Sequence, residues 1–428
     1  MKRYSEYKDS GVKWIGEIPE HWKCTRIKFI ANLYGRIGFR GYNSKDLNKD
    51  GIGAITLSPS NMKDMMMDYT NVTYLSWEKY NESPEIMIKH GDILFVKTGS
   101  SYGKSCYVDN LPQEATINPQ ILRINPLING RFLCYYFNSS LARTFTECGV
   151  VGGTIPTISQ EKVGNFIALN PPLSEQQAIV TYLDTKVAKI DEYISIAEKK
   201  ISALEELKQT IIAEAVTRGI HKDVPMKDSG VKWIGMIPEH WKVHKIRSHF
   251  KERRVKVSDK DFQALSVAKI GIVPQLEDAC KTDNGDNRKQ VLKGDFVVNS
   301  RSDRKGSCGI SPLDGSVSLI NIVLRPFNIL QEYVHYLFRS HNYIEEFYRN
   351  GRGIVADLWT TRYSEMRNIQ IPVPPLSEQQ EIVTYIEAKV ANINQLCQAE
   401  RSQIEKLKEY TQRLISDLVT GKVKVKND

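Results

Sequence analysis

The chain has 428 residues, of which 41% are hydrophobic and 25% are charged, a composition that fits a folded protein with two or three domains. No stretch approaches the roughly 18 to 20 consecutive apolar residues of a membrane-spanning helix, and the first residues lack the apolar core of a signal peptide. These features argue against a membrane protein, and we expect a cytoplasmic location. The seven cysteines form no CxxC pair, which favours reduced thiols.

Two long phrases each occur twice. KDSGVKWIGEIPEHWKCTRIK spans Lys8 to Lys28 and returns almost unchanged from Lys227 to Arg247. PPLSEQQAIVTYLDTKVAKI begins at Pro171, and its copy begins at Pro374. A period of about 200 residues indicates duplicated domains related by an approximate two-fold axis, not a solenoid. We therefore predict four segments: a globular domain at 1–169, a helix at 170–225, a second domain at 226–372 and a second helix at 373–428.

Each globular domain is predicted to be α/β, with a mixed sheet and helices. In chain order, the first domain should contain strands near Ile93–Val96 and Ile121–Ile124, a helix near Arg131–Phe145 and a strand near Phe166–Leu169. The second domain should mirror these elements because the surrounding phrases repeat.

The two halves differ most in Tyr34–Asn61 and Lys251–Gln275, which show little resemblance to each other. We expect these stretches to express whatever distinguishes the two domains. The WIGEIPEHW phrase, in contrast, is expected to pin each N-terminal segment to its core through large apolar side chains. These are Trp14, Ile15, Ile18 and Trp22, and their counterparts Trp233, Ile234, Ile237 and Trp241.

Each PPLSEQQ phrase opens a long predicted helix. Ser174 and Gln177 match the N-cap and N3 positions of a capping box, and the second copy repeats them. Apolar residues then recur at alternating steps of four and three, which is the period of a coiled-coil seam. The step from Leu204 to Leu207 interrupts this register in the first copy and recurs in the second.

Gly219 and Gly421 mark the predicted helix ends. The matched lengths of the two helices favour an antiparallel pair within the chain, so that two similar domains are separated by two long coiled-coil helices. The alternative is that each helix pairs with a helix of another chain.

The positive charge lies on the globular domains. Residues 1–169 carry +4 and residues 226–372 carry +7, whereas the helical segments together carry −2, for a total of +9. Two basic domains suggest a polyanion engaged at two places.

Candidate nucleic-acid contacts cluster in the loops that follow the central strand of each domain. Their small, flexible residues can approach phosphates or base edges, and arginine can bind guanine through two hydrogen bonds. For each residue the alternative is an ordinary solvated surface charge. The candidates are Lys97, Ser100, Tyr102 and Lys104 in the first loop, Arg301, Arg304 and Lys305 in the second, and Arg36, Arg40, Tyr42, Arg253, Arg254 and Arg352 elsewhere.

Three motifs resemble those of other functional classes, but each lacks the spacing or the residue that its class requires. The stretch GSSYGKS at Gly99–Ser105 is one residue too short between its glycines for a phosphate-binding P-loop. NPPL at Asn170–Leu173 lacks the aromatic residue on which a methyltransferase stacks a flipped base. The spacing of His240, His244 and His249 is too loose for a zinc site. We therefore predict neither a catalytic group nor a metal or cofactor in this chain.

The repeated WIGEIPEHW opening, the PPLSEQQ helices and the alternation of repeated and variable segments resemble the specificity subunit of type I restriction-modification systems. The resemblance implies two target-recognition domains that each read one half of an asymmetric split site in double-stranded DNA. It also implies docking of two methyltransferase subunits, which hold S-adenosylmethionine and methylate adenine. Restriction subunits would join the complex to translocate and cleave DNA with ATP.

Two other classes of function remain open. A DNA-acting enzyme such as a nicking endonuclease would cut or methylate DNA alone, but the sequence lacks a recognisable acidic and lysine core. A scaffold whose two domains bind proteins would have a partner that is insensitive to salt and independent of DNA.

If the long helices set the distance between the two DNA half-sites, lengthening both helices should lengthen the spacer between them. Inserting one heptad after Ala203 and another near Ser402 lengthens both helices by about 10 Å, or about three base pairs of DNA. Mapping of methylated adenines should then show a longer spacer between the two half-sites. An active variant with an unchanged spacer would contradict the idea that the helices set this distance.

Overall fold

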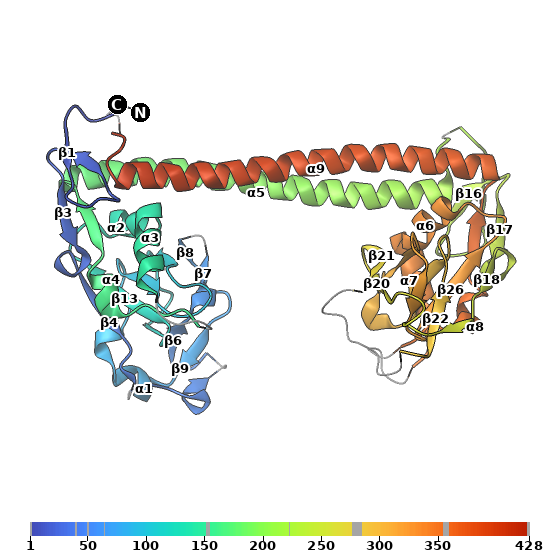
Figure 1. The fold of residues 1–428 in the computed structure, drawn as a ribbon, viewed down its shortest axis with the longest axis horizontal. Coiled ribbons are helices and arrows are strands. Elements are labelled where there is room, and N and C mark those ends of the chain that lie inside the picture. The colour runs from blue at the N-terminus through green and yellow to red at the C-terminus, as the bar shows by residue number, and fades with distance from the viewer. Residues whose placement is uncertain are drawn as a thin grey trace. The chain divides into compact units, whose positions relative to one another are not determined.

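The computed structural model describes residues 2–38, 41–48, 51–63, 65–150, 155–221, 223–275, 285–353 and 359–425. The chain forms two compact units. Unit 1 comprises Met1–Ile196 with Ser402–Asp428, and unit 2 comprises Ala197–Arg401. Each unit therefore joins one globular domain to the start of one long helix and the end of the other (Figure 1). The predicted boundaries separate each domain from its helix, whereas here the helix ends share the core of the domain.

Unit 1 is built on an antiparallel sheet in the order β11-β10-β13-β4. All four side chains of its central strand are buried, although successive side chains point to opposite faces. Ile93 and Phe95 join one apolar cluster while Leu94 and Val96 join another, so both faces of the sheet are covered. The strands are β4 (Ala31–Gly35), β10 (Ile93–Val96), β11 (Ser105–Tyr107) and β13 (Ile121–Pro126), which confirms the two central strands expected from the sequence.

Helices pack on one face of this sheet. The single helix expected over Arg131–Phe145 is wrong, because the chain forms two helices with a break at Asn138–Ser139. The hydroxyl of Ser139 accepts the N–H of Ala142 and caps the second helix, which favours a new helix over a continuous one. The helices are α2 (Gly130–Phe137), α3 (Ser140–Gly149) and α4 (Gln160–Gly164).

A second sheet, in the order β12-β6-β9-β5, covers the other face. Its strands are β5 (Leu47–Asn48), β6 (Ala54–Leu57), β9 (Thr73–Leu75) and β12 (Ala115–Ile117), with α1 (Trp77–Asn81) and the hairpin of β7 (Met62–Lys63) and β8 (Met66–Met67) beside them. The repeated framework forms a hairpin of β1 (Tyr7–Asp9) and β2 (Glu17–Pro19), and a pair of β3 (Lys23–Arg26) with β14 (Ile167–Asn170). The latter confirms the last expected strand, displaced by one residue.

Unit 2 mirrors this plan, as the repeat predicts. Its main sheet has the equivalent order β18-β26-β23-β24. The strands are β18 (Phe250–Glu252), β23 (Phe296–Asn299), β24 (Cys308–Ile310) and β26 (Asn321–Pro326), and the helices are α6 (Gln331–Arg339), α7 (His341–Arg349) and α8 (Tyr363–Met366). The framework pairs β15 (Met226–Asp228) with β16 (Met236–Pro238), and β17 (Lys242–Lys245) with β27 (Gln370–Val373).

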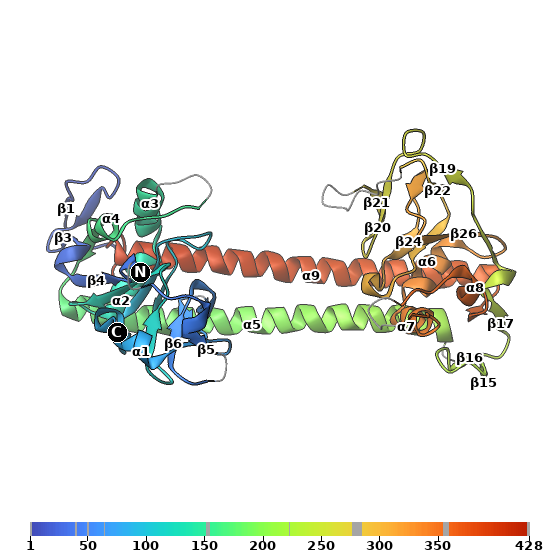
Figure 2. The same cartoon turned by 90° about the horizontal axis from the view of Figure 1, so that it is seen from below.

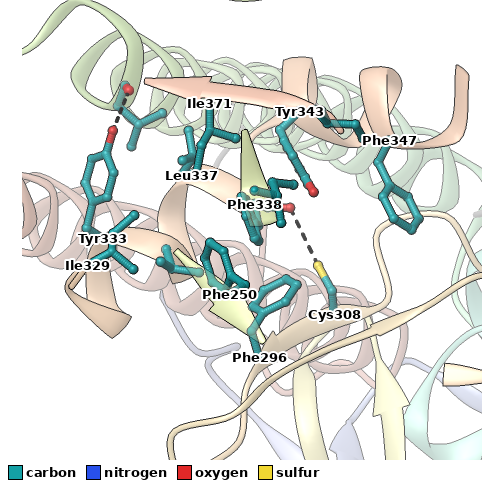
Figure 3. Packing of buried hydrophobic residues seen from close by; sticks show 14 of the residues in the cluster. Phe250, Phe296, Cys308, Ile329, Tyr333, Leu337, Phe338, Tyr343, Phe347 and Ile371 are labelled. Atoms are coloured by element: carbon teal, nitrogen blue, oxygen red, sulfur yellow. Dashed lines mark hydrogen bonds between the residues drawn. The ribbon is translucent and has the colours of Figure 1, made fainter. Parts of the chain in front are cut away.

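Aromatic side chains fill the core of unit 2 (Figure 3). The rings of Phe338 on α6 and Tyr343 on α7 stack with centroids 4.3 Å apart, and Phe296 of the sheet meets Phe338 edge to face at 4.9 Å. The hydroxyl of Tyr333 donates to the carbonyl of Val216 at 3.0 Å, which ties the domain to the end of the first long helix.

The second layer is where the two units differ. Unit 2 has a three-stranded sheet in the order β19-β22-β25 and a separate hairpin, in place of the four-stranded sheet of unit 1. These strands are β19 (Lys256–Val257), β20 (Leu265–Ala268), β21 (Gly271–Pro274), β22 (Arg288–Val291) and β25 (Gly315–Val317). The unlike stretches of sequence thus form unlike structures on a common framework.

The long helices are α5 (Leu173–Arg218) and α9 (Leu376–Val419). In unit 1 the start of α5 packs against the end of α9, and Figure 2 shows them side by side. In unit 2 the end of α5 packs against the start of α9. The pairing within each unit is therefore antiparallel and internal to the chain, as expected. No helix in the described ranges is both long enough and apolar enough to cross a membrane.

The side chains at the predicted register break, Leu207 and its repeat counterpart Tyr410, point away from the paired helix, since they are 48% and 41% exposed. One detail of the expected helices is wrong. Ser174 is not the N-cap, because the helix already begins at Leu173 and the carbonyl of Pro172 accepts from Gln176 at 3.0 Å.

The glutamine of each PPLSEQQ phrase fastens the helix start to the domain. The buried side chain of Gln176 donates to the carbonyl of Pro171 and accepts the N–H of Asn129, at the start of α2. Gln379 does the same with Pro374 and Leu330, at the start of α6. These bonds explain why the phrase is repeated.

The tryptophan anchors are confirmed at Trp22 and Trp241, which are fully buried. A Cβ on Gly421 would lie 3.1 Å from the ring of Trp22, and one on Gly219 would lie 3.2 Å from Trp241. Both glycines also have φ above 70°, so glycine suits the helix end for two reasons. Trp14 differs from the expectation, since it is 49% exposed.

In each unit a buried carboxylate beside the main sheet forms an ion pair with an arginine. Asp92 accepts from Arg123 at 2.6 and 3.2 Å, and Asp295 accepts from Arg253 at 2.6 and 3.1 Å. We expect Arg253→Ala to destabilise unit 2 by about 3 to 5 kcal/mol, because it leaves a buried carboxylate without its partner. Chemical unfolding followed by tryptophan fluorescence measures the change.

Arg254→Ala is the matched control, since the neighbouring Arg254 side chain is 77% exposed and pairs with Glu252 at the surface. Its unfolding midpoint should stay that of the unmutated chain. Equal destabilisation by the two substitutions would contradict the structural role of Arg253.

Candidate nucleic-acid interface

The loop after the central strand is held in the same way in both units. In unit 2 the N–H of Ser302 donates to the carbonyl of Trp359 at 2.9 Å, and the N–H of Thr361 donates to Ser300 at 2.9 Å. In unit 1 the N–H of Gly99 donates to Pro156 at 3.1 Å. Each loop is thus pinned to a segment that returns from the helical layer, and its side chains project from a fixed backbone.

The structure brings Arg352 close to the second loop. Arg301 and Arg352 both pair with Thr360 through backbone bridges, although they are far apart in the sequence. Their side chains are 45% and 84% exposed, and that of Arg304 is 65% exposed. The sequence-predicted residues Arg301, Arg304 and Arg352 therefore form one basic surface, which we call the arginine loop surface.

Acidic neighbours orient these cations without burying them. Asp303 lies 3.1 Å from the Nε of Arg301 and 3.7 Å from that of Arg304. Lys305 pairs with Glu345 at 2.6 Å. Exposed pairs of this kind contribute little energy, and a guanidinium has five N–H donors, so most donors of the arginines stay available to phosphates or bases.

Several apolar and amide groups beside the loops were missed by the sequence interpretation. Trp359 is 38% exposed next to Thr360, and Ile320, 39% exposed, accepts from the hydroxyl of Ser300 through its carbonyl. In unit 1 the carbonyl of Gln120 accepts the N–H of Lys97 at 2.8 Å, which places an exposed amide at the loop. Only the strand pairing reveals these neighbours.

The first loop is less basic than the second. Ser100 is exposed, Tyr102 is half-buried, and the ammonium group of Lys104 donates to the carbonyl of Met62. Burial lowers the pKa of Lys97. A cavity of about 470 Å³ lies beside the loop, lined by Tyr102, Lys104 and Arg143 among others.

Of the other predicted contacts, Arg36 and Arg253 point into the protein, whereas Arg254 is exposed. Arg36 is only 6% exposed, donates to the carbonyl of Ile117 and the hydroxyl of Thr116, and lies over the ring of Tyr42. Burial lowers the pKa of Arg36. Arg253 belongs to the buried pair with Asp295, and Arg254 pairs with Glu252 at the surface. Arg40 lies outside the described residues.

The histidines of the second framework also have partners within the protein. His240 lies 2.7 Å from Glu378, and His244 lies 2.8 Å from His249. Across the described ranges no three His, Cys, Asp or Glu side chains gather in a way that could hold a metal ion.

Comparison with known proteins gives the family. The family model described as "Type I restriction modification DNA specificity domain" matches residues 19–206 and 240–406, one match beginning in each unit. The chain belongs to this family. The specificity subunits of this family recognise DNA. The two loops described above present exposed polar and basic groups in equivalent places of the two units.

Relatives and solved structures are similar to this chain along nearly its whole length. The MjaVIII specificity subunit of Methanocaldococcus jannaschii is 24% identical, with 98% of both chains covered. The EcoKI specificity subunit of Escherichia coli K12 is 23% identical, with 95% of this chain and 90% of that one covered. The HsdS subunit of Thermoanaerobacter tengcongensis has the same fold, with a TM-score of 0.51, 16% identity and coverage of 95% and 98%. A chain from a study of type I complex assembly gives a TM-score of 0.67 at 16% identity, with coverage of 95% and 99%.

Substitutions in the arginine loop surface should distinguish recognition of a base from binding of a phosphate. If Arg301 or Arg304 reads a guanine, alanine at that position should cost about 1 to 3 kcal/mol for the target and relax one position of one half-site. A phosphate contact would instead weaken all sequences alike and reduce the salt slope by about one. Binding of the intact methyltransferase complex to randomised half-sites at several salt concentrations separates the two roles.

Arg401→Ala is the control, since this α9 side chain is 64% exposed and lies on the helix rather than in the loop. It should change neither the half-site nor the slope. An unaltered site and slope in both loop variants would exclude the arginine loop surface from DNA binding.

Proposed function

We propose that this specificity subunit recognises a bipartite, asymmetric DNA site, with one half-site read by each unit. The observation that carries the proposal is the combination of an equivalent main sheet with unlike second layers and unlike loops. A common framework places the two loops equivalently, while their side chains differ: Lys97, Ser100 and Tyr102 in one, and Arg301, Arg304 and Lys305 in the other. Different donors favour different bases.

In this proposal the chain itself catalyses no reaction. Partner methyltransferase subunits bind S-adenosylmethionine and methylate adenine, and restriction subunits translocate and cleave unmodified DNA with ATP. Two methyltransferase subunits fit best, because the framework that would receive them occurs twice. The protein-binding scaffold is not favoured, because the relatives are named as subunits of restriction enzymes.

The direct test is to map methylated adenines in cells that carry this subunit with its methyltransferase. The expected result is one split motif with two different halves. The purified chain alone should neither methylate nor cut DNA. A continuous motif, or activity of the chain alone, would overturn the proposal.

The internal repeat also predicts how half of the chain behaves. In unit 1 the start of α5 packs on Leu414 and Leu418 at the end of α9. A fragment of residues 1–225 lacks these side chains, but the end of its own α5 carries their repeat counterparts, Ile211 and Ala215. The fragment should therefore dimerise and, with the methyltransferase, modify a palindromic split site that contains the first half-site twice.

Sedimentation of the fragment and methylation mapping check the two parts of this prediction. As a control, charged residues in place of Ile211 and Ala215 should prevent the dimer, because they remove the apolar side chains that would take the places of Leu414 and Leu418 in the core of the other copy. A monomeric unmutated fragment, or an asymmetric modified site, would contradict the repeat as interpreted.

A further inference from the structure

Large apolar side chains of unit 2 are exposed beside the loop that carries the arginines. Leu319, Ile320 and Trp359 are 41%, 39% and 38% exposed. Single exposed apolar side chains are common on protein surfaces, but these three belong to the two segments that hold one loop. We call them the apolar patch.

Hydrogen bonds place the apolar patch on two sides of the loop. The hydroxyl of Ser300 donates to the carbonyl of Ile320 at 2.6 Å, and the N–H of Ser302 donates to the carbonyl of Trp359 at 2.9 Å. Arg301 lies between these two serines, and its side chain is 45% exposed. The apolar patch and the arginine loop surface therefore flank the same short stretch of backbone, so that one ligand meets both.

The arginines select the class of ligand. A protein that covered the apolar patch would also cover Arg301 and its neighbours, and burying guanidinium groups is costly unless each is paired. The phosphates of DNA pair with guanidinium groups directly, and the specificity subunits of this family recognise DNA. The ligand that fits both the cations and the apolar side chains is therefore duplex DNA.

The base edges of duplex DNA offer few apolar groups. In the major groove, guanine, cytosine and adenine present hydrogen-bond donors and acceptors, whereas thymine adds a 5-methyl group. In the minor groove, A·T and T·A pairs present acceptors only. An apolar side chain that reaches a base edge between phosphate-bound arginines therefore favours the methyl group of thymine.

Unit 1 differs at the equivalent place. The carbonyl of Gln120 accepts the N–H of Lys97, as the carbonyl of Ile320 accepts from the hydroxyl of Ser300. Gln120 is exposed, and a glutamine amide can bind adenine through two hydrogen bonds. The position beside the end of each central strand thus carries an amide in unit 1 and an apolar side chain in unit 2, which suits two unlike half-sites.

We propose that the apolar patch contacts the 5-methyl group of a thymine in the half-site read by unit 2. The inference rests on the proposed function, because it takes unit 2 as the reader of one half-site. It adds uncharged residues to the DNA-binding surface and names the base that they select.

The first measurement uses the unmutated chain in the intact methyltransferase complex. Each thymine of the mapped site, on either strand, is replaced in turn by deoxyuridine, which lacks only the 5-methyl group. At one thymine of one half-site the replacement should weaken binding by about 3- to 10-fold, as expected for the loss of one buried methyl group. This result does not depend on the folding of a variant.

Two variants then identify the contact. Leu319→Gln with Ile320→Gln replaces one side of the apolar patch by amides, and Trp359→Gln replaces the other side. In at least one of these variants thymine and deoxyuridine should bind equally at that position, because the side chain that touches the methyl group is gone. The exposure of all three side chains favours folding of both variants.

Ile270→Gln is the matched control. Ile270 is 75% exposed at the turn between β20 and β21, outside the segments that hold the loop, and its replacement makes the same chemical change. This variant should keep the full preference for thymine over deoxyuridine.

The outcomes separate the inference from the proposed function. A split site at which deoxyuridine replaces every thymine without loss would overturn the contact and leave the function intact. Apolar side chains wedged between base steps would give this result, since a wedge does not need the methyl group. A preference for thymine that persists in both patch variants, or that disappears equally in the control, would also overturn the contact. A continuous site would overturn the proposed function itself.

Discussion

The fold depends on the packing of one tryptophan in each unit. Trp22 lies in the core of unit 1 together with the start of α5 and the end of α9. Trp241 lies in the core of unit 2 together with the end of α5 and the start of α9. The glycine after each helix leaves room for the ring. In unit 1 the contact also holds the chain ends together, since Lys2 pairs with Lys424. Because both helices end on such an anchor, their pairing belongs to the core of each unit.

Near each anchor, a carboxylate of the PPLSEQQ phrase meets the framework phrase. Glu175 accepts from His21, Trp22 and Tyr4 at 2.6 to 3.1 Å, and Glu378 lies 2.7 Å from His240. These hydrogen bonds outweigh the effect of burial and lower the pKa of Glu175. The two repeated phrases are thus two sides of one contact, which accounts for their joint repetition while the second layer varies.

The two units carry different side chains in equivalent loops. Exposed arginines occupy the loop of unit 2 that follows the central strand, whereas the loop of unit 1 has Lys97, Ser100 and Tyr102 in the corresponding stretch. The loops and the second layers can differ without altering the framework, because the contacts that hold the long helices to each domain are made by the repeated phrases.

The sequence alone determined the duplication, the central strands, the helix ends at Gly219 and Gly421 and the antiparallel seam, because each depends on local pattern or on repetition. It did not determine the start of the helix at Leu173 or the break at Ser139, where neighbouring bonds decide between close alternatives. Nor did it separate Arg253, paired with buried Asp295, from Arg254, which is exposed. Adjacent residues of one type look alike in sequence, and only the tertiary structure decides which one faces an acid in the core and which one faces solvent.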